Sequence, residues 1–103
     1  MQIWEHDRFR AERPWGSVLL MDMGEHQARL HWTDRPFQWH VNDGEEVFVV
    51  LDGEVDMHYG PEGRERRCRL RAGDTAVIAE GERHVAHPVG EARVLVVERR
   101  RSP

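Results

Sequence analysis

The sequence contains no lysine, only one cysteine and no long apolar run. Cys68 has no second cysteine with which to form an internal disulfide, which agrees with a reducing compartment. We expect it to lie on a strand and to pack there. No stretch approaches the roughly 20 apolar residues of a membrane-spanning helix, and the polar start MQIWEHDRFR lacks the apolar core of a signal peptide. We therefore expect a cytoplasmic protein that makes no membrane contact.

Positive charge is in deficit. The 15 basic residues, all arginine, face 19 acidic residues, which gives a formal net charge of -4. Bulk electrostatics therefore gives the chain no reason to bind nucleic acid. One segment, residues 64–71, is rich in arginine at mostly alternate positions, a pattern that favours the solvated face of a strand over a site for polyanions.

Helical periodicity is also missing. Short segments with period-two alternation, separated by glycine and proline turns, predict an all-β sandwich or barrel. At 103 residues the chain makes a single domain with one core. We expect an irregular N-terminal arm over residues 1–16, a barrel over residues 17–98 that opens with a buried strand at 17–22, and a tail over residues 99–103.

Potential metal ligands gather in the stretch WHVNDGEEVFVVLDG and in one later segment. His40 and Asn42 are two residues apart, so they share a face on an extended strand, and Glu46 opens the next strand close by. His84 follows a strand and a tight glycine-containing turn. Two imidazoles and one carboxylate suit Fe(II), Zn, Mn or Ni and leave coordination positions open. Glu45 is a weaker candidate, because a shift of one residue turns it to the opposite face.

These two segments resemble the motifs of the cupin superfamily. The first motif corresponds to His40, Asn42, Glu46 and Gly53, and the second to Gly73, Ala79, Gly81 and His84. Two residue types depart from the pattern: Asn42 stands in place of the second histidine, and Ala79 in place of a proline. The resemblance implies a double-stranded β-helix, or jelly-roll barrel, with a divalent metal ion held by His40, Asn42, Glu46 and His84.

A ligand pocket should lie beside the metal site. We expect its wall to consist of side chains that share a face with the metal ligands, namely Gln38, Phe48, Val50 and Ile78. Phe37 and Trp39 should then point away from it. In the predicted strand at 27–33, Arg29 and His31 face either solvent or the barrel interior, and solvent is favoured for Arg29.

Three further aromatic positions have predicted places outside the metal site. His58 alternates with acidic residues and should be exposed, and His87, three residues after His84, should face away from the barrel interior. Trp15 lies in the arm and should cover one edge of the barrel. None of the three is expected to bind the metal.

The strand after Glu46 is apolar on both faces and predicts an association surface. Val47, Val49 and Leu51 share the face that points away from the metal site. Such a strand must be covered twice, and the second cover is either the N-terminal arm or another subunit. We predict an isologous homodimer.

Several functions remain open from the sequence. Cupin resemblance implies a metal-dependent isomerase, lyase or dioxygenase acting on a carbonyl-bearing or sugar-like metabolite. The segment RPWGS at 13–17 is similar to one that precedes the barrel in type II mannose-6-phosphate isomerases. A noncatalytic protein that binds or senses a small ligand is the alternative, which Asn42 favours because an amide oxygen is a weaker ligand than imidazole. A barrel that serves only dimerisation, with its ligand-type residues merely hydrogen-bonded, is the third.

Overall fold

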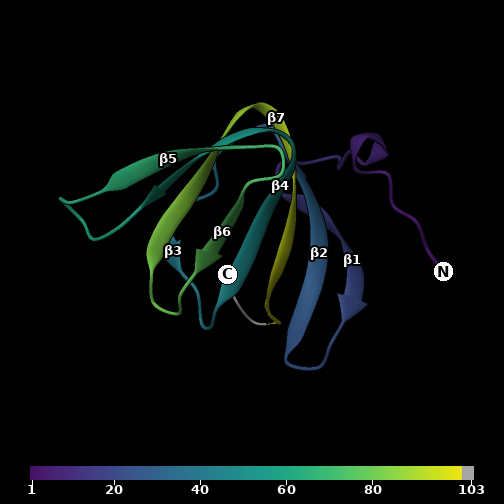
Figure 1. The fold of residues 1–103 in the computed structure, drawn as a ribbon, viewed down its shortest axis with the longest axis horizontal. Helices are drawn as coiled ribbons and strands as arrows, with labels where there is room; N and C mark the ends of the chain where they lie inside the picture. The colour runs from purple at the N-terminus through teal and green to yellow at the C-terminus, as the bar shows by residue number, and fades with distance from the viewer. Residues whose placement is uncertain (101–103) are drawn as a thin grey trace.

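The computed structural model describes residues 1–100, which form antiparallel strands preceded by one short 3-10 helix. The elements are η1 (His6–Arg8), β1 (Gly16–Asp22), β2 (His26–Thr33), β3 (His40–Val41), β4 (Glu46–Tyr59), β5 (Arg66–Arg71), β6 (Thr75–Ile78) and β7 (Arg83–Arg99). The strand order is β1-β2-β7-β4-β5, with β3 paired to β7 and β6 paired to β4 (Figure 1). The all-β prediction is confirmed.

The C-terminal boundary of the barrel differs from the predicted one by one residue. The last strand, β7, includes residue 99, which we expected in the tail, and residues 101–103 of that tail lie outside the described residues. Among residues 1–100, no helix is both long and apolar enough to cross a membrane.

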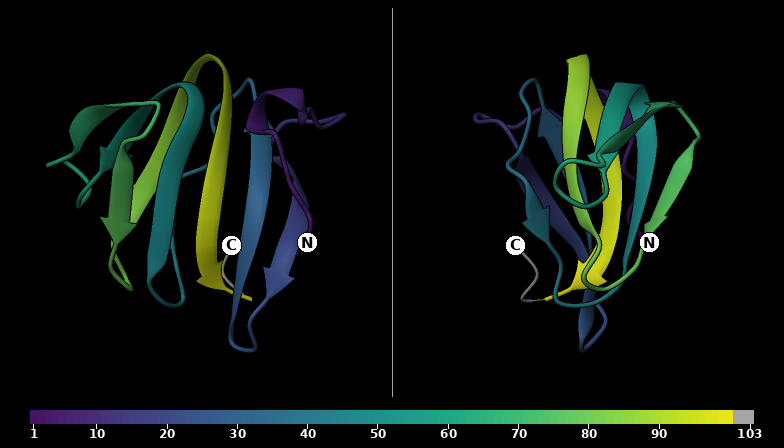
Figure 2. Two further views of the ribbon diagram at one scale, coloured as in Figure 1. Left: turned by 45° about the vertical axis from the view of Figure 1, so that its right-hand side comes forward. Right: turned by 90° about the vertical axis from the view of Figure 1, so that its left-hand side faces the viewer.

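The two long strands β4 and β7 form the centre of the sheet and pair along most of their length (Figure 2). Their register shifts on both sides of Asp52. At this bend Gly53 has φ +79°, and a Cβ atom there would lie 2.3 Å from the carbonyl oxygen of Glu91. Only glycine fits such a position. Gly53 is therefore a bend inside the continuous strand β4 and not a turn between two strands.

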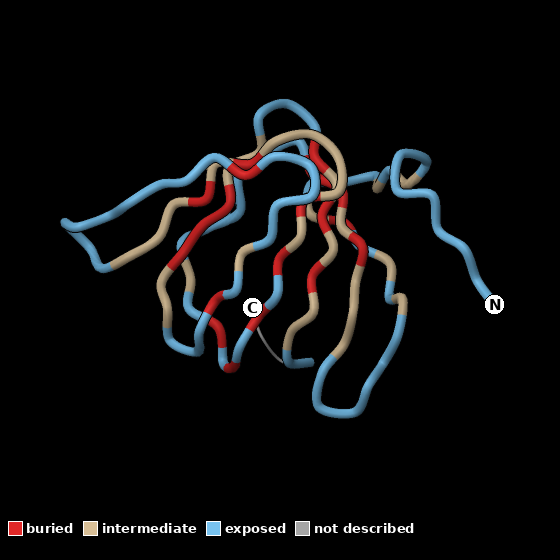
Figure 3. Tube along the Cα trace, in the orientation of Figure 1, coloured by how far each residue is buried: buried red, intermediate tan, exposed pale blue. Residues whose placement is uncertain are grey.

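The core lies between the two halves of this bent sheet. Buried and less buried residues alternate along β4 and β7, as expected when one face of each strand points inward (Figure 3). The buried apolar cluster consists of Phe48, Val50, Val55, Met57, Leu70, Ile78, Ala86, Ala92, Val94 and Val96. This packing fixes the strands whose first residues carry the candidate site.

The N-terminal arm covers part of the outer face of the sheet. Trp32 is only 3% exposed although it faces away from the core cluster. The guanidinium of Arg10 lies 5.2 Å from the centre of the Trp32 ring, and Arg93 Nε donates to the carbonyl oxygen of Phe9 at 2.6 Å. The arm therefore covers the outer face of β2, on which Leu30 and Trp32 lie. Residue 29 belongs to the opposite face, which points into the barrel.

Two burial predictions for edge strands are wrong. The strand at 17–22 was expected to be buried, yet Leu19 is 43% and Met21 is 59% exposed. Cys68 was expected to pack, yet it is exposed. The physical reason is the same in both cases: β1 pairs only with β2 and β5 only with β4, so each lies at an edge of the sheet. An apolar sequence does not reveal whether its strand has one neighbour or two.

Candidate metal centre

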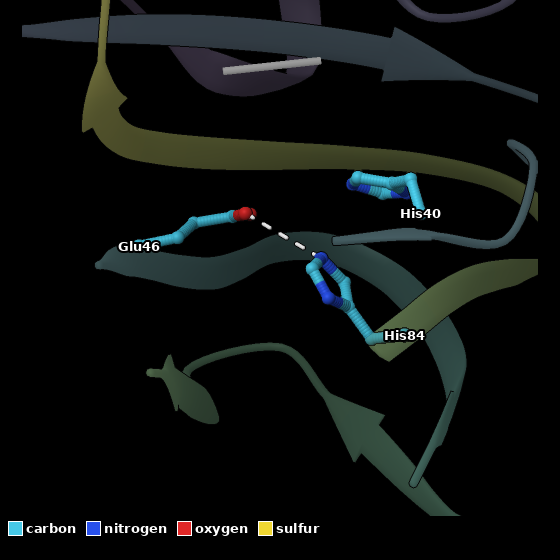
Figure 4. Close-up of side chains that lie close together, drawn as sticks. All are labelled: His40, Glu46 and His84. Atoms are coloured by element: carbon cyan, nitrogen blue, oxygen red, sulfur yellow. Dashed lines mark ion pairs between the residues drawn. The ribbon is translucent and has the colours of Figure 1, made fainter. Parts of the chain in front are cut away.

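Three side chains from separate strands converge at one end of the barrel. His40, Glu46 and His84 each offer one ligand atom, and these atoms lie within 4.8 Å of one another. The side chains point toward a common space (Figure 4). His40 is the register partner of His84 where β3 pairs with β7, and their ring centres are 4.3 Å apart. Glu46 Oε1 lies 3.6 Å from His84 Nε2.

Backbone carbonyl groups set the orientation of both imidazoles. His40 Nδ1 lies 2.8 Å from the carbonyl oxygen of Gln38, and His84 Nδ1 lies 2.9 Å from that of Glu82. A carbonyl oxygen only accepts, so we assign the proton to Nδ1 in both rings. The Nε2 lone pairs are then free for a cation, which is the usual arrangement of metal-binding histidines.

The electrostatics of the two rings differ. Burial lowers the pKa of His40, and the neighbouring His84 acts in the same direction. Burial also acts to lower the pKa of His84, but hydrogen bonding to Glu46 and to the Glu82 backbone outweighs it, so that pKa is raised. His40 is therefore neutral near pH 7, while Glu46 favours a positive charge beside His84. A metal ion in place of that proton would satisfy the same carboxylate.

Asn42 occupies the position of the second motif histidine and contacts the glutamate. Its side chain is 3% exposed, and its Nδ2 donates to Glu46 Oε1. Its Oδ1 is buried without a hydrogen-bond partner in residues 1–100. An orphaned buried oxygen beside two imidazole nitrogens and a carboxylate fits a divalent cation of the Zn, Fe, Mn or Ni type. Asn42 thus holds Glu46 in place, and its Oδ1 keeps an unused acceptor among residues 1–100.

The converging side chains line a cavity of about 260 Å³. Strand β2 contributes Gln27, Arg29 and His31, and the other lining residues outside the three ligands are Trp15, Phe37, Phe48, Ala86, Val96 and Glu98. One wall is thus polar and the others are largely apolar or aromatic. This composition is typical of a site for a small molecule.

Comparison with known proteins identifies the family. The model of the cupin domain family matches residues 25–98, which is most of the chain. The chain belongs to the cupin family. A cupin-2 domain protein from Shewanella frigidimarina has 25% sequence identity and a TM-score of 0.75, with 87% of this chain and 85% of that chain covered. The double-stranded β-helix predicted from the motifs is therefore confirmed.

Two further relatives are oxygenases by name. The cupin is 32% identical over 63 residues to 3-hydroxyanthranilate 3,4-dioxygenase of Bos taurus, with 61% of this chain matched. It spans about a fifth of the length of that relative, since 22% of the bovine protein is covered. Hydroquinone 1,2-dioxygenase from Sphingomonas sp. TTNP3, solved with 4-hydroxybenzoate bound, has 19% identity and a TM-score of 0.72, covering 84% and 66% of the two chains. That last likeness shows the fold alone.

The predicted pocket wall differs from the observed one at three of its four positions. Phe48 lines the cavity of the cupin, whereas Val50 is fully buried in the core and Ile78 lines a separate cavity behind His84. Gln38 is exposed, and it contributes its carbonyl oxygen to His40 instead of its side chain to the pocket. The direction predicted for Gln38 was wrong.

Phe37 takes the place in the cavity that we expected for Gln38. The prediction of opposite directions for these two residues assumed an extended strand from residue 37 onward, but β3 contains only His40 and Val41. The preceding segment is irregular, and the Phe37 backbone N–H donates to the carbonyl oxygen of Ala86 at 3.3 Å. Period-two reasoning fails where no strand exists.

Three polar lining residues were missed or misplaced by the sequence reasoning. Arg29 was expected to face solvent, yet it lines the cavity, as do Gln27 and Glu98. A signal for Glu98 was present, because it continues the inward face of Val94 and Val96 in period two. Register also places it between Gln27 and Glu46 in neighbouring strands. Burial, followed by the charge of Glu46, raises the pKa of Glu98 to about 7.

Of the histidines His31, His58 and His87, only His31 lines the cavity. His31, which the sequence left open between solvent and interior, lines the cavity, where its Nδ1 lies 3.4 Å from the carbonyl oxygen of Trp15. His58 and His87 stack on one another away from the triad, with ring centres 4.2 Å apart. Neither belongs to the group of candidate metal ligands.

Proposed function

We propose that this cupin binds one divalent metal ion through His40, Glu46 and His84 and acts on a small metabolite held in the adjoining cavity. The observation that carries the proposal is the convergence of the three ligand atoms within 4.8 Å at the cavity wall. Two imidazoles and one carboxylate form a donor set that leaves positions open for a substrate. The unpartnered Oδ1 of Asn42 supports a cation beside it.

Dioxygenation of a small aromatic or carbonyl-bearing substrate is the reaction class that we propose first. Iron(II) in such a site would supply the activation of dioxygen. The protein's own contribution would be to orient the substrate and exclude water with the aromatic walls of Trp15, Phe37 and Phe48. Flat apolar walls suit a ring better than a sugar, whose hydroxyl groups need more hydrogen-bond partners. The name of one relative, 3-hydroxyanthranilate 3,4-dioxygenase of Bos taurus, supports the same class.

Elemental analysis of protein produced without an affinity tag tests the metal site. The wild type should carry metal close to one equivalent per chain, and a variant combining His40→Ala with His84→Ala should lose it. Oxygen uptake by the iron-loaded wild type is then measured with hydroquinone, catechol, 2,3-dihydroxybenzoate and acetylacetone. Equal trace metal in wild type and variant would end the metal proposal, and a loaded protein that consumes no oxygen with any substrate would end the dioxygenase proposal.

A noncatalytic binding or sensing role is the alternative function. The specific observation that favours it is the hydrogen bond from Asn42 Nδ2 to Glu46. This bond occupies one carboxylate oxygen and weakens the donor set relative to one with a third imidazole. In this case the loaded protein should bind a small ligand with one-to-one stoichiometry and return it unchanged after prolonged incubation in air.

We also propose that the cupin forms a homodimer through the outer face of its sheet. One continuous register row across five strands is apolar, and it consists of Met21, Ala28, Val97, Val47 and Val77. Val77 is 73%, Met21 59% and Val47 37% exposed. Exposed apolar surface of this extent favours association. The N-terminal arm covers the neighbouring part of this face instead, around Trp32.

Sedimentation at low protein concentration tests the dimer. The wild type should sediment at twice the chain mass of 12.1 kDa, and Val47→Arg should yield the monomer because it buries an unpaired charge in the contact. Val89→Arg is the matched control, since Val89 is also exposed but lies outside the register row. A 12.1 kDa wild type would contradict the proposal.

A further inference from the structure

Arg29 differs from every other arginine in residues 1–100. Three arginines in that range are partly buried, namely Arg29, Arg83 and Arg93. Arg83 is paired with Glu65 at 3.5 Å and Arg93 with Asp52 at 2.6 Å, but Arg29 makes no ion pair within residues 1–100. A partly buried charge usually has a partner of opposite sign, because desolvation without one is costly.

The hydrogen-bonding capacity of Arg29 is mostly unused. Its Nη1 donates to Ser17 Oγ at 3.0 Å, which is a neutral partner and its only side-chain hydrogen bond within residues 1–100. A guanidinium carries five N–H donors in a planar fork that matches a carboxylate. Because Arg29 lines the cavity, the remaining donors are within reach of a bound ligand.

His31 adds a second unsatisfied group on the same wall. It stands two residues from Arg29 on β2, on the same face, and both line the cavity. With its Nδ1 turned to the carbonyl oxygen of Trp15, its Nε2 is buried and has no partner in residues 1–100. An unprotonated Nε2 accepts a hydrogen bond, so it is placed to receive one from a hydroxyl or amino group of the ligand.

The charges around the cavity define the sign and size of the ligand charge. With a divalent ion bound and the histidines neutral, the lining keeps one net positive charge even when Glu46 and Glu98 are both ionised. A ligand with one negative charge balances this net positive charge. A phosphate monoester carries a second negative charge, which would face the Glu98 carboxylate without a positive partner. The aromatic side chains Trp15 and Phe37 meet edge to face with ring centres 5.8 Å apart, and both line the cavity, where they offer apolar surface to the body of the ligand.

We propose that Arg29 anchors the ligand of this cupin and that the ligand is a small planar monocarboxylate whose carboxylate pairs with the guanidinium. The proposal names the substrate class of the proposed function and rests on it in assuming that the ligand occupies the cavity beside His40, Glu46 and His84. The carboxylate lies at the β2 wall, and the opposite end of the ligand faces the three metal ligands. Arg29 is thus the residue that selects for charge.

Calorimetric titration of anaerobic, nickel-loaded protein tests the proposal with three matched probes: 4-hydroxybenzoate, uncharged 4-hydroxybenzamide and phenyl phosphate. Wild type should bind the carboxylate about tenfold or more tightly than the amide, as expected for a charge-assisted pair. Arg29→Gln should remove that preference, because it weakens binding of the carboxylate much more than binding of the amide, and Arg29→Lys should keep part of it, because a lysine retains the charge but not the fork. Arg67→Gln is the control, since Arg67 is exposed on β5.

Each outcome has a distinct meaning when metal content is measured on the same samples. A wild type that does not prefer the carboxylate to the amide, or that prefers phenyl phosphate to both, overturns the ligand class without use of any variant. An unchanged preference in folded Arg29→Gln overturns the role of Arg29. A further outcome is that the protein holds no metal while Arg29→Gln still loses the preference for the carboxylate over the amide. That result would support Arg29 as the anchor and refute the proposed metal function.

Discussion

Within residues 1–100 the cupin contains two pairs of neighbouring imidazoles that each have one member on β7, with the other member on β3 in one pair and on β4 in the other, and only one pair forms a candidate metal site. The rings of His40 and His84 are 4.3 Å apart and those of His58 and His87 are 4.2 Å apart. The inner pair has Glu46 beside it, within the 4.8 Å group. Proximity of imidazoles is therefore not what distinguishes a metal site here.

The difference lies in the carboxylate and in the backbone carbonyls. Asp56 is the register partner of His87, but both of its oxygens accept hydrogen bonds from Arg69, at 2.5 and 3.1 Å. Within residues 1–100 neither outer ring makes a hydrogen bond to a carbonyl group, whereas both inner rings do so through Nδ1. The inner pair thus has a carboxylate that is not paired with an arginine and has fixed tautomers, and the outer pair has neither.

Removal of the inner ligands should produce the largest effect. Substitution of Glu46 or His84 by alanine should weaken Zn(II) binding by about 10²-fold or more, because each removes a direct ligand from a set of three. The double variant His58→Ala, His87→Ala should bind zinc like the wild type. Competition with a chromogenic chelator measures both affinities. If zinc binding is lost only in the His58→Ala, His87→Ala variant, the outer pair and not the inner pair is the metal site.

Replacement of Asn42 should have a smaller effect on the same site. Asn42→Ala removes the hydrogen bond that orients Glu46 and should lower zinc affinity about tenfold, as for other supporting contacts around metal ligands. Asn42→His should raise the affinity above that of the wild type by restoring a third imidazole. Chelator competition again gives the values. If alanine and histidine at this position leave zinc affinity equal, Asn42 has no part in the site.

The sequence was most informative about positions fixed by motif spacing. His40, Glu46 and His84 could be placed together because each stands at the start of a strand, where alternation and motif spacing define the face. Gln38 and Phe37 could not be placed, since the irregular segment before β3 obeys no period. Arg29 was misjudged because its side of β2 depends on which face the N-terminal arm covers, and that is decided by tertiary packing.

The pH dependence of stability should report the protonation of Glu98. In the metal-free protein the pKa of Glu98 is raised to about 7 from 4.5, so the folded state keeps a proton that the unfolded state releases. Stability should therefore fall as pH rises from about 4.5 to about 7 and stay lower above it. Because Glu98 is only partly buried, we expect about 1 to 2 kcal/mol from this group at pH 8, well below the full conversion of its shift.

The variant Glu98→Gln should remove that part of the pH dependence. Urea unfolding of metal-free wild type and variant between pH 4.5 and 8 measures it, and the variant should gain relative stability as pH rises. Glu91→Gln is the control, since Glu91 is exposed on the same strand. Parallel curves for wild type and Glu98→Gln would show that Glu98 is not held in its protonated form.

The smallest expected effect concerns the outer histidines and sharpens the contrast with the inner pair. Burial, and then the neighbouring His58, lower the pKa of His87, while the charge of Asp56 raises it. His58→Ala should therefore raise the pKa of His87, and Asp56→Asn should lower it further, because each removes one of two opposing charges. NMR titration of the imidazole resonances detects both shifts. Since no metal ligand is involved, added zinc should leave these titrations unchanged, and a zinc-dependent shift would place a cation where the structure has only a stacked pair.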